Sequence, residues 1–205
     1  MAYLPGGTFF DLPGKRSYVD VPIDSDKDNS ILTTEFLEAS EALCGLFDIL
    51  GSVAFTPVKS DISGNITKIR TRQLASPLDS STLQSLVRTE LAAKKHTASE
   101  GLLWLTRGLD FTAQALRHNM DHPAEELSTS FRHSYGNTLK PHHSFVVKPI
   151  FSAAMSATPY RKDFYTKLGD DPERVQKELE VWLAALEKRV GVLKEFMERK
   201  ENKWK

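Results

Sequence analysis

The chain has 205 residues, which is enough for one large domain or for one domain with tails. Hydrophobic residues make up 40% of the sequence and charged residues 26%, proportions typical of a soluble globular protein that buries its own core. The 27 lysines and arginines balance the 27 aspartates and glutamates, so the net charge gives no indication of nucleic acid as a partner.

The first residues are rich in proline, glycine and aspartate, with scattered aromatics and no period. We therefore expect an extended or partly ordered arm at 1–29 and a single domain at 30–205. The start of the chain lacks the basic and apolar stretches of a secretory signal, and no run approaches the ~20 apolar residues that span a bilayer. The single cysteine, Cys44, has apolar neighbours, which favours a buried thiol in a reducing compartment. These features predict a cytosolic protein, most simply a monomer.

From Ile31 onward, apolar residues recur at helical spacing and no segment alternates as a strand would. A first helix, capped by Thr33 or Thr34, is expected to end at Gly51, and Pro57 marks the start of the second. Start and stop signals divide the remainder into six further helices. The third helix is expected to be capped by Asp79, Ser80 or Ser81, and the fourth to open with a capping box of Thr97 and Glu100. The fifth is expected to end near 136–137, and the sixth to contain Pro149 as a kink or in its first turn. The seventh is expected to stop at Gly169, and a long eighth helix to open with Asp171 and Pro172. The sequence thus predicts a single all-α domain of about eight helices packed in layers.

Sequence signatures of catalysis are absent. The chain has no nucleophile elbow, no zinc-protease motif, no glycine-rich phosphate loop and no cysteine cluster. His118 and His122 have the i, i+4 spacing that a metal can use, but a proline follows at once and no third ligand is apparent. We therefore expect no enzymatic activity, no metal and no cofactor.

A polar stripe lies within the segment "SDISGNITKIR" at 60–70. Asp61, Asn65 and Lys68 are spaced i, i+4, i+7, so they share one face of a helix. Three isoleucines, each one position later, form an apolar stripe directly beside it. Such a pattern fits a solvated helix face, and it also fits polar groups at the rim of the core, where an acid needs specific donors to offset its loss of water.

Two further segments carry unusual residues. Gly101 and Gly108 flank Trp104 at helical spacing, although each glycine costs about 1 kcal/mol relative to alanine inside a helix. The pair either leaves one face of the indole open for a flat ligand or lets another helix pack closely. His142 and His143 are adjacent and cannot share a helix face, so one of them is expected to point inward, as a structural group or as part of a site.

These segments together resemble the glycolipid transfer protein family. The resemblance covers 36–168 and is carried by "GSVAFTPVKSDISGNITKIR", "GLLWLTRGL", "HHSFVV" and "IFSAAMSATPYRKDF". It implies an all-α two-layer helical sandwich that encloses one glycosphingolipid, with the sugar at a surface site and the ceramide chains in an apolar cavity. The implied function is non-enzymatic transfer of glycosphingolipids between membranes. The alternative is a glycolipid-sensing regulator whose loaded state controls partner binding.

The resemblance also implies roles for single residues. Asp61 and Asn65 would bind hydroxyls of the first sugar, Asp61 would also accept from the ceramide amide N–H, and Lys68 would add a donor. Trp104 would be the platform under the sugar ring. His143 would donate to the ceramide amide carbonyl, because the family motif reads His-x-aromatic. Relatives specific for ceramide phosphate carry basic residues in place of Asn65 and Trp104, so a neutral sugar is favoured here.

Two larger sets complete the expected site. Apolar side chains near the polar stripe are expected to line the hydrocarbon cavity: Leu46, Phe47, Leu50, Ala54, Phe55, Val58, Phe151 and Met155. Periodicity alone cannot separate a lined cavity from a filled core. Transient docking at a membrane surface is expected through Phe145, Tyr160 and Trp204, with Lys140, Lys148, Arg161 and Lys162 facing the headgroups. Trp204 could equally pack against the domain.

One position departs from the family pattern. Phe145 stands where several relatives have tryptophan, so membrane affinity or sugar selectivity is expected to differ from theirs.

Overall fold

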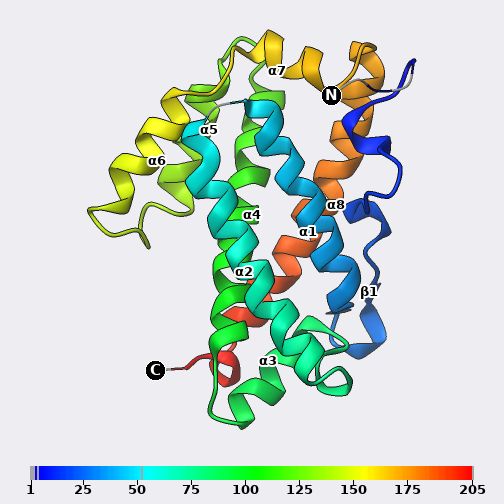
Figure 1. Ribbon diagram of the computed structural model, residues 1–205, viewed down its shortest axis with the longest axis vertical. Helices are drawn as coiled ribbons and strands as arrows, with labels where there is room; N and C mark the ends of the chain where they lie inside the picture. The colour runs from blue at the N-terminus through cyan, green and yellow to red at the C-terminus, as the bar shows by residue number, and fades with distance from the viewer. Residues whose placement is uncertain (1–2, 4, 52, 205) are drawn as a thin grey trace.

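The computed structural model describes residue 3 and residues 5–51 and 53–204, and it is built almost entirely of helices (Figure 1). The α-helices of this part of the chain are α1 (Thr33–Leu50), α2 (Thr56–Ala75), α3 (Leu83–Ala92), α4 (Thr97–Asp121), α5 (Leu127–Asn137), α6 (Val147–Ser156), α7 (Arg161–Leu168) and α8 (Pro172–Glu198). The predicted all-α class with about eight helices is confirmed.

Helix α4 lies at the centre of the fold. It contacts α2, α3, α5 and α8, while α1 packs beside α2. Figure 1 shows α1 and α2 in front of α8 and α4, so the two pairs form two layers. Helix α6 packs on α5 and on the short turn before α2, and α7 contacts α1 and α8. This arrangement is the two-layer helical sandwich that the family resemblance implied.

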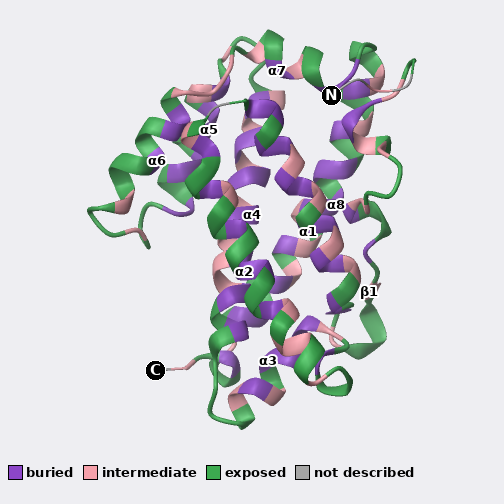
Figure 2. Ribbon diagram, in the orientation of Figure 1, coloured by how far each residue is buried: buried purple, intermediate pink, exposed green. Residues whose placement is uncertain are grey.

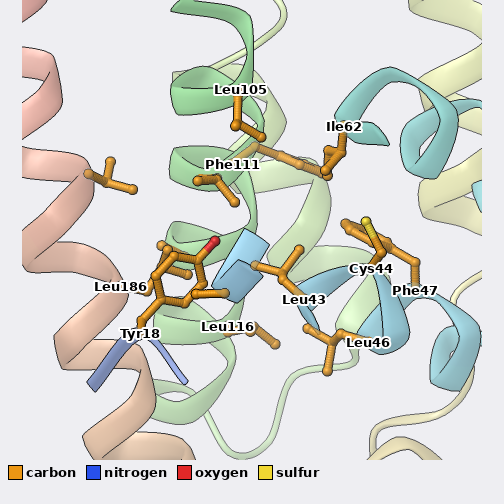
Figure 3. Packing of buried hydrophobic residues seen from close by; sticks show 14 of the residues in the cluster. Tyr18, Leu43, Cys44, Leu46, Phe47, Ile62, Leu105, Phe111, Leu116 and Leu186 are labelled. Carbon is orange, nitrogen blue, oxygen red and sulfur yellow. The ribbon is translucent and has the colours of Figure 1, made fainter. Parts of the chain in front are cut away.

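The buried faces of the helices meet in one hydrophobic core between the layers (Figures 2 and 3). Leu43 of α1, Ile62 of α2 and Leu105 and Phe111 of α4 are each at most 2% exposed. Full burial of such a side chain is worth about 1.5–3 kcal/mol, so the contacts between layers fix where each helix lies. Cys44 lies at the edge of this core, where burial raises the pKa of its thiol.

Several helix ends lie where the sequence predicted them. Gly51 follows the last residue of α1 with φ +71°, a left-handed conformation that glycine adopts without strain. Asp171 caps α8, and its carboxylate accepts from the amide N–H groups of Glu173 at 3.0 Å and Arg174 at 3.1 Å. Pro149 lies in the first turn of α6, and α7 stops immediately before Gly169.

The predicted starts of two other helices are wrong. Thr33 is already the first residue of α1, which begins after Leu32 without a side-chain cap. Helix α3 is capped by Thr82, which forms a capping box with Ser85. The capping residues predicted for α3 precede Thr82 because 78–80 form a 3-10 turn of their own. Adjacent serine and threonine residues all suit a helix start, so the local pattern cannot choose among them.

The start of α4 is satisfied by a residue from another helix. The capping box predicted at Thr97 is wrong, because Thr97 is the first helical residue. Instead the carboxylate of Glu90 in α3, which is 4% exposed, accepts from the amide N–H of Ala98 at 3.0 Å and that of Ser99 at 2.7 Å. It also accepts from the Ser99 hydroxyl at 2.7 Å. A buried anion at this end satisfies the first free amides and complements the helix dipole.

The N-terminal arm is packed against the domain in the part that the structure describes. It contains short 3-10 turns and a two-stranded antiparallel ladder, β1 (Ile23–Asp24) with β2 (Ser30–Ile31), which the sequence analysis did not predict. Tyr18 is fully buried, with its hydroxyl 2.9 Å from that of Ser40 and its ring centre 5.7 Å from that of Trp182 in α8. Residues 1, 2 and 4 of the predicted arm lie outside the described part of the chain.

Replacing Glu90 tests the start of α4. We expect Glu90→Ala to lower the free energy of unfolding by about 2–4 kcal/mol, because three buried donors lose a charged acceptor. Glu90→Gln keeps an acceptor oxygen and should cost less. Urea unfolding followed by circular dichroism measures both changes, and Glu100→Ala, an exposed acid in the first turn of α4, is the control. A loss no larger than that of the control would contradict this role of Glu90.

Candidate functional site

Helix α2 places the predicted polar stripe at the edge of the core. The three isoleucines beside the stripe are at most 4% exposed and face inward. Asn65 is also buried, at 3% exposed, whereas Asp61 and Lys68 lie at the exposed rim. The Lys68 ammonium donates to the side-chain oxygen of Asn65 at 3.3 Å. The stripe therefore crosses the boundary between core and solvent, as expected for polar groups at a rim rather than for a fully solvated face.

The carboxyl of Asp61 has an unusual electrostatic environment for an exposed residue. The protein around it excludes water, which raises its pKa, while the charge of Lys68 and a hydrogen bond with Asn65 act in the opposite direction. Loss of solvent is the largest of these effects. The carboxylate has further acceptor positions, and a ligand that donates hydrogen bonds can use them.

Close packing of α4 on α2 explains one of the two glycines around Trp104. A Cβ atom on Gly101 would lie 3.2 Å from the backbone oxygen of Asn65 and 3.1 Å from the Cβ of Lys68, which is tighter than nine in ten Cβ contacts in proteins. A Cβ on Gly108 would meet Ile62 at an ordinary 3.6 Å. Close helix packing, one of the two interpretations left open by the sequence, therefore accounts for Gly101. Since Trp104 follows Gly101 by one turn, this contact also brings the indole to the rim.

Trp104 is half-buried and surrounded by cationic and aromatic groups. The guanidinium carbon of Arg107 lies 4.8 Å from the centre of the indole. The ring of His143 is nearly parallel to the indole, with 5.9 Å between ring centres and 21° between planes. The ring of His142 stands perpendicular to it at 6.4 Å. The structure thus brings together Trp104 and His143, which the sequence placed about 40 residues apart, at one place on the surface.

His143 points inward, and it has a partner that the sequence analysis missed. The hydroxyl of Tyr135 lies 3.2 Å from Nδ1 of His143. Burial lowers the pKa of His143, and the positive charges of neighbouring groups, among them Lys148, lower it further, which favours the neutral ring. When the tyrosine donates to Nδ1, the ring proton sits on Nε2, where it can donate to a ligand. No local pattern marks Tyr135, because the contact depends on how α5 and the following loop fold together.

The residues expected to line a hydrocarbon cavity are packed together in the structure. Their rings form an aromatic cluster, in which the centres of Phe47 and Phe55 lie 6.0 Å apart and those of Phe111 and Phe151 lie 6.1 Å apart. Ala54 is half-buried against the same core. The other members of the set are at most 6% exposed: Leu46, Phe47, Leu50, Phe55, Val58, Phe151 and Met155. These side chains fill the space between the layers in this conformation.

The aromatic residues considered for membrane docking differ in exposure. Phe145 is 85% exposed in the loop before α6, and Tyr160 is 73% exposed just before α7. Trp204, in contrast, packs against the core with its ring 5.7 Å from that of His96. Packing on the domain, the alternative raised from the sequence, thus describes Trp204.

The basic residues expected beside them also differ. Arg161 is half-buried and donates to the backbone oxygen of Asn119 at 2.7 Å. Lys140, Lys148 and Lys162 are exposed. Among the described residues, no helix combines the length and apolarity needed to cross a membrane.

The histidines with metal-like spacing instead stack on one another. The ring of His118 lies between those of His122, at 4.1 Å, and His133, at 4.3 Å. His118 also contacts the carboxylate of Glu125 at 3.0 Å. In the part of the chain that the structure describes, no group of three or more histidine, cysteine or acidic residues is arranged to hold a metal ion.

Comparisons with known proteins agree on one family. Residues 31–170 match the family model described as glycolipid transfer protein. A glycolipid transfer protein of Aureobasidium melanogenum is 67% identical over 203 residues, covering 99% of both chains. The crystal structure of HET-C2, described as a fungal glycolipid transfer protein, superposes with a TM-score of 0.93 at 62% identity and covers 96% of this chain and 100% of its own. This confirms a further likeness read from the sequence, to the fungal heterokaryon-incompatibility member of the family.

A more distant structure agrees with these matches. The structure of FAPP2, described as selecting simple glycosphingolipids with the same fold, gives a TM-score of 0.84 at 32% identity and covers 94% of this chain and 95% of its own.

The two glycines of α4 provide a matched test of the α2–α4 contact. Gly101→Ala should lower the free energy of unfolding by about 1–3 kcal/mol, because its methyl group would press on the backbone of α2. Gly108→Ala should be neutral or stabilising by up to about 1 kcal/mol, because its methyl group fits and alanine favours the helix. Urea unfolding of both variants measures the difference. Equal effects would show that α4 does not depend on a close approach at Gly101.

Proposed function

The chain belongs to the glycolipid transfer protein family, and from this membership we propose that it carries glycosphingolipids between membranes by binding the sugar at the α2–α4 rim and the ceramide chains in its interior. The relatives matched above are named as lipid transfer proteins, so the chain is a lipid carrier and not an enzyme. Two observations support the finer proposal: Gly101, one turn before Trp104, packs on Asn65 and Lys68 of the α2 stripe, and the ring of His143 stacks on the indole of Trp104.

The rim residues supply the chemistry that a sugar headgroup needs. Asp61 and the amide of Asn65 can accept from and donate to neighbouring hydroxyls, and Lys68 adds a cationic donor. The indole of Trp104 offers an apolar surface on which a sugar ring can lie. A lipid without the sugar would bring none of the hydroxyl groups that can donate to the carboxyl of Asp61, so the site favours the lipid that carries them. The rim thus provides selectivity for a neutral sugar.

His143 is suited to bind the ceramide amide. With its ring neutral and Tyr135 donating to Nδ1, its Nε2–H is free to donate to the amide carbonyl of the ceramide. In this proposal Asp61 accepts from the amide N–H of the same group. The amide is therefore held from both sides, where the sugar ends and the hydrocarbon begins.

The apolar interior must provide most of the binding energy. Taking a two-chain lipid from a bilayer into water costs about 0.8 kcal/mol per methylene, or on the order of 20 kcal/mol for roughly thirty methylenes. A hydrogen bond of the headgroup returns only about 0.5–3 kcal/mol. The rim selects the lipid, but only burial of its chains in the protein can compensate for its removal from the membrane.

Lipid entry requires the aromatic cluster to open, and α6 is the element best placed to do so. Helix α6 packs mainly on α5 and on the turn before α2, and it carries Phe151, the member of the cluster nearest His143, with 4.5 Å between ring centres. An outward shift of α6 would free space directly below the ceramide amide, at the cost of the contact between Phe151 and Phe111 of α4. We therefore propose α6 as the moving wall of the hydrocarbon cavity.

The surface around α6 also fits a reversible membrane contact. Phe145, Val146, Ile150 and Tyr160 are between 43% and 85% exposed and lie before, in and after α6, and Lys148 and Lys162 are exposed near them. Aromatic and aliphatic side chains can enter the headgroup region while the ammonium groups meet the phosphates. With no net charge overall, the chain should bind weakly and leave again, as a cytosolic, monomeric carrier must.

Glycolipid transfer between vesicles tests the proposed function. The wild type should move a glucosyl- or galactosylceramide from donor to acceptor vesicles, and Asp61→Val and Trp104→Ala should each reduce the rate about tenfold or more, because each removes a main contact to the sugar. Leu78→Ala, at a 94% exposed position away from the rim, is the control. No transfer by the wild type would refute the carrier, and full transfer by Asp61→Val would refute the assigned site.

The docking surface is tested by Phe145→Ser. We expect this variant to bind phosphatidylcholine vesicles more weakly and to transfer glycolipid several-fold more slowly, while its stability stays within about 0.5 kcal/mol of the wild type, because the side chain is exposed. Co-sedimentation with vesicles and urea unfolding measure the two effects. Unchanged vesicle binding would remove Phe145 from the docking surface.

A further inference from the structure

Helix α6 lies at the periphery of the fold next to α5, and two exposed side chains join these helices (Figure 1). Nη2 of Arg132, in the middle of α5, donates to the hydroxyl oxygen of Ser156 at 2.7 Å. Ser156 is the last residue of α6, and its hydroxyl donates in turn to the backbone oxygen of Ser152 at 2.9 Å. This pair, the Arg132–Ser156 latch, ties the C-terminal end of α6 to α5.

The latch differs in kind from the apolar contacts of α6. The inward face of this helix carries Phe151, Ala154 and Met155, which are at most 6% exposed. Apolar contacts have no strong directional preference, so such a face can shift and repack without losing all of its contacts. A hydrogen bond weakens steeply when its distance or angle changes. An outward shift of α6 at this end would therefore break the latch.

The guanidinium of Arg132 has no stronger partner than this hydroxyl. Among the described residues it forms no ion pair with a carboxylate, and both members of the latch are exposed to solvent. An exposed hydrogen bond to a neutral hydroxyl exchanges readily for bonds to water, so it favours the closed position of α6 only modestly. A contact of this strength can hold α6 in place and still break in every cycle of lipid uptake and release.

We propose that the Arg132–Ser156 latch holds α6 closed over the aromatic cluster and thereby limits the rate at which the carrier takes up and releases its lipid. The proposal rests on the proposed function, in which α6 moves outward to admit the ceramide chains. Arg132 and Ser156 do not touch the lipid and act as positioning residues. The free energy needed to break the latch adds to the barrier for uptake, so a weaker latch speeds uptake and a stronger one slows it.

Substitutions at Ser156 test the latch in both directions. Extraction of a fluorescent galactosylceramide from quenched phosphatidylcholine vesicles by excess protein gives the rate of uptake. Ser156→Ala removes the hydroxyl, and we expect extraction about two- to fivefold faster than with the wild type. Ser156→Asp offers Arg132 a carboxylate, which makes the contact charge-assisted, and should slow extraction by a similar factor. Ser152→Ala is the matched control at another exposed serine of α6, whose hydroxyl is outside the latch, and should leave the rate unchanged.

Two further measurements assign the effect to the latch. Arg132→Ala combined with Ser156→Asp should extract the lipid as fast as Ser156→Ala, because the carboxylate then has lost its partner in α5. Co-sedimentation with the same vesicles should be equal for the wild type, Ser156→Ala and Ser152→Ala, since none of these changes alters the charge of the protein. Membrane docking is thereby separated from the opening of α6. Circular dichroism confirms that each variant is folded.

The possible outcomes separate the latch from the function it rests on. Faster extraction by Ser156→Ala together with slower extraction by Ser156→Asp supports the latch. A Ser156→Ala rate equal to or below that of the wild type overturns it, and so does a change in rate that vesicle binding accounts for. In these cases extraction by the wild type still supports the carrier. Failure of the wild type to extract the lipid would instead overturn the proposed function itself.

Discussion

Helix α4 approaches α2 closely at Gly101, and the site depends on this contact. A Cβ atom on Gly101 would lie 3.2 Å from the backbone oxygen of Asn65, so a larger residue would press the two helices apart. Trp104 follows Gly101 by one turn of α4, and the buried carboxylate of Glu90 accepts from the amides at the start of the same helix. In the proposed site, a wider spacing between α2 and α4 would separate the indole from the groups that would bind hydroxyls. The proposed position of the sugar therefore depends on backbone packing as well as on the site residues.

Two polar groups of the rim are partly shielded from water by the protein around them. The pKa of Asp61 is raised and that of His143 lowered, in both cases chiefly because the protein excludes water around them. Each group is thus held with fewer partners than it could use, and a sugar and an amide would supply what is missing. Groups in this state add little to the stability of the empty protein, but they let a small number of hydrogen bonds discriminate strongly between lipids.

The interior differs from the rim, because aromatic side chains pack closely with one another there. In the proposed function, the ceramide chains would need the space around Phe55 and Phe151. A carrier that kept an open apolar cavity in water would lose the contacts that stabilise its fold. Filling the space with the carrier's own rings, and placing the cluster under a peripheral helix such as α6, avoids this loss while leaving a route for the lipid. The exposed apolar residues around α6 then lie where the lipid would enter.

The sequence by itself determined the all-α class, the number of helices, the stops at Gly51 and Gly169 and the capped start at Asp171, because helical periodicity and terminal capping act over a few residues. The family motifs identified Asp61, Asn65, Lys68, Trp104 and His143 without showing how they meet. Only the tertiary structure revealed Glu90 as the cap of α4, Tyr135 as the partner of His143 and the packing of Trp204 against the core. It also showed that Gly101 serves helix packing. The physical reason is the separation along the chain. Each of these features joins residues that are distant in sequence, and a local sequence pattern does not show which distant residues will pack against it.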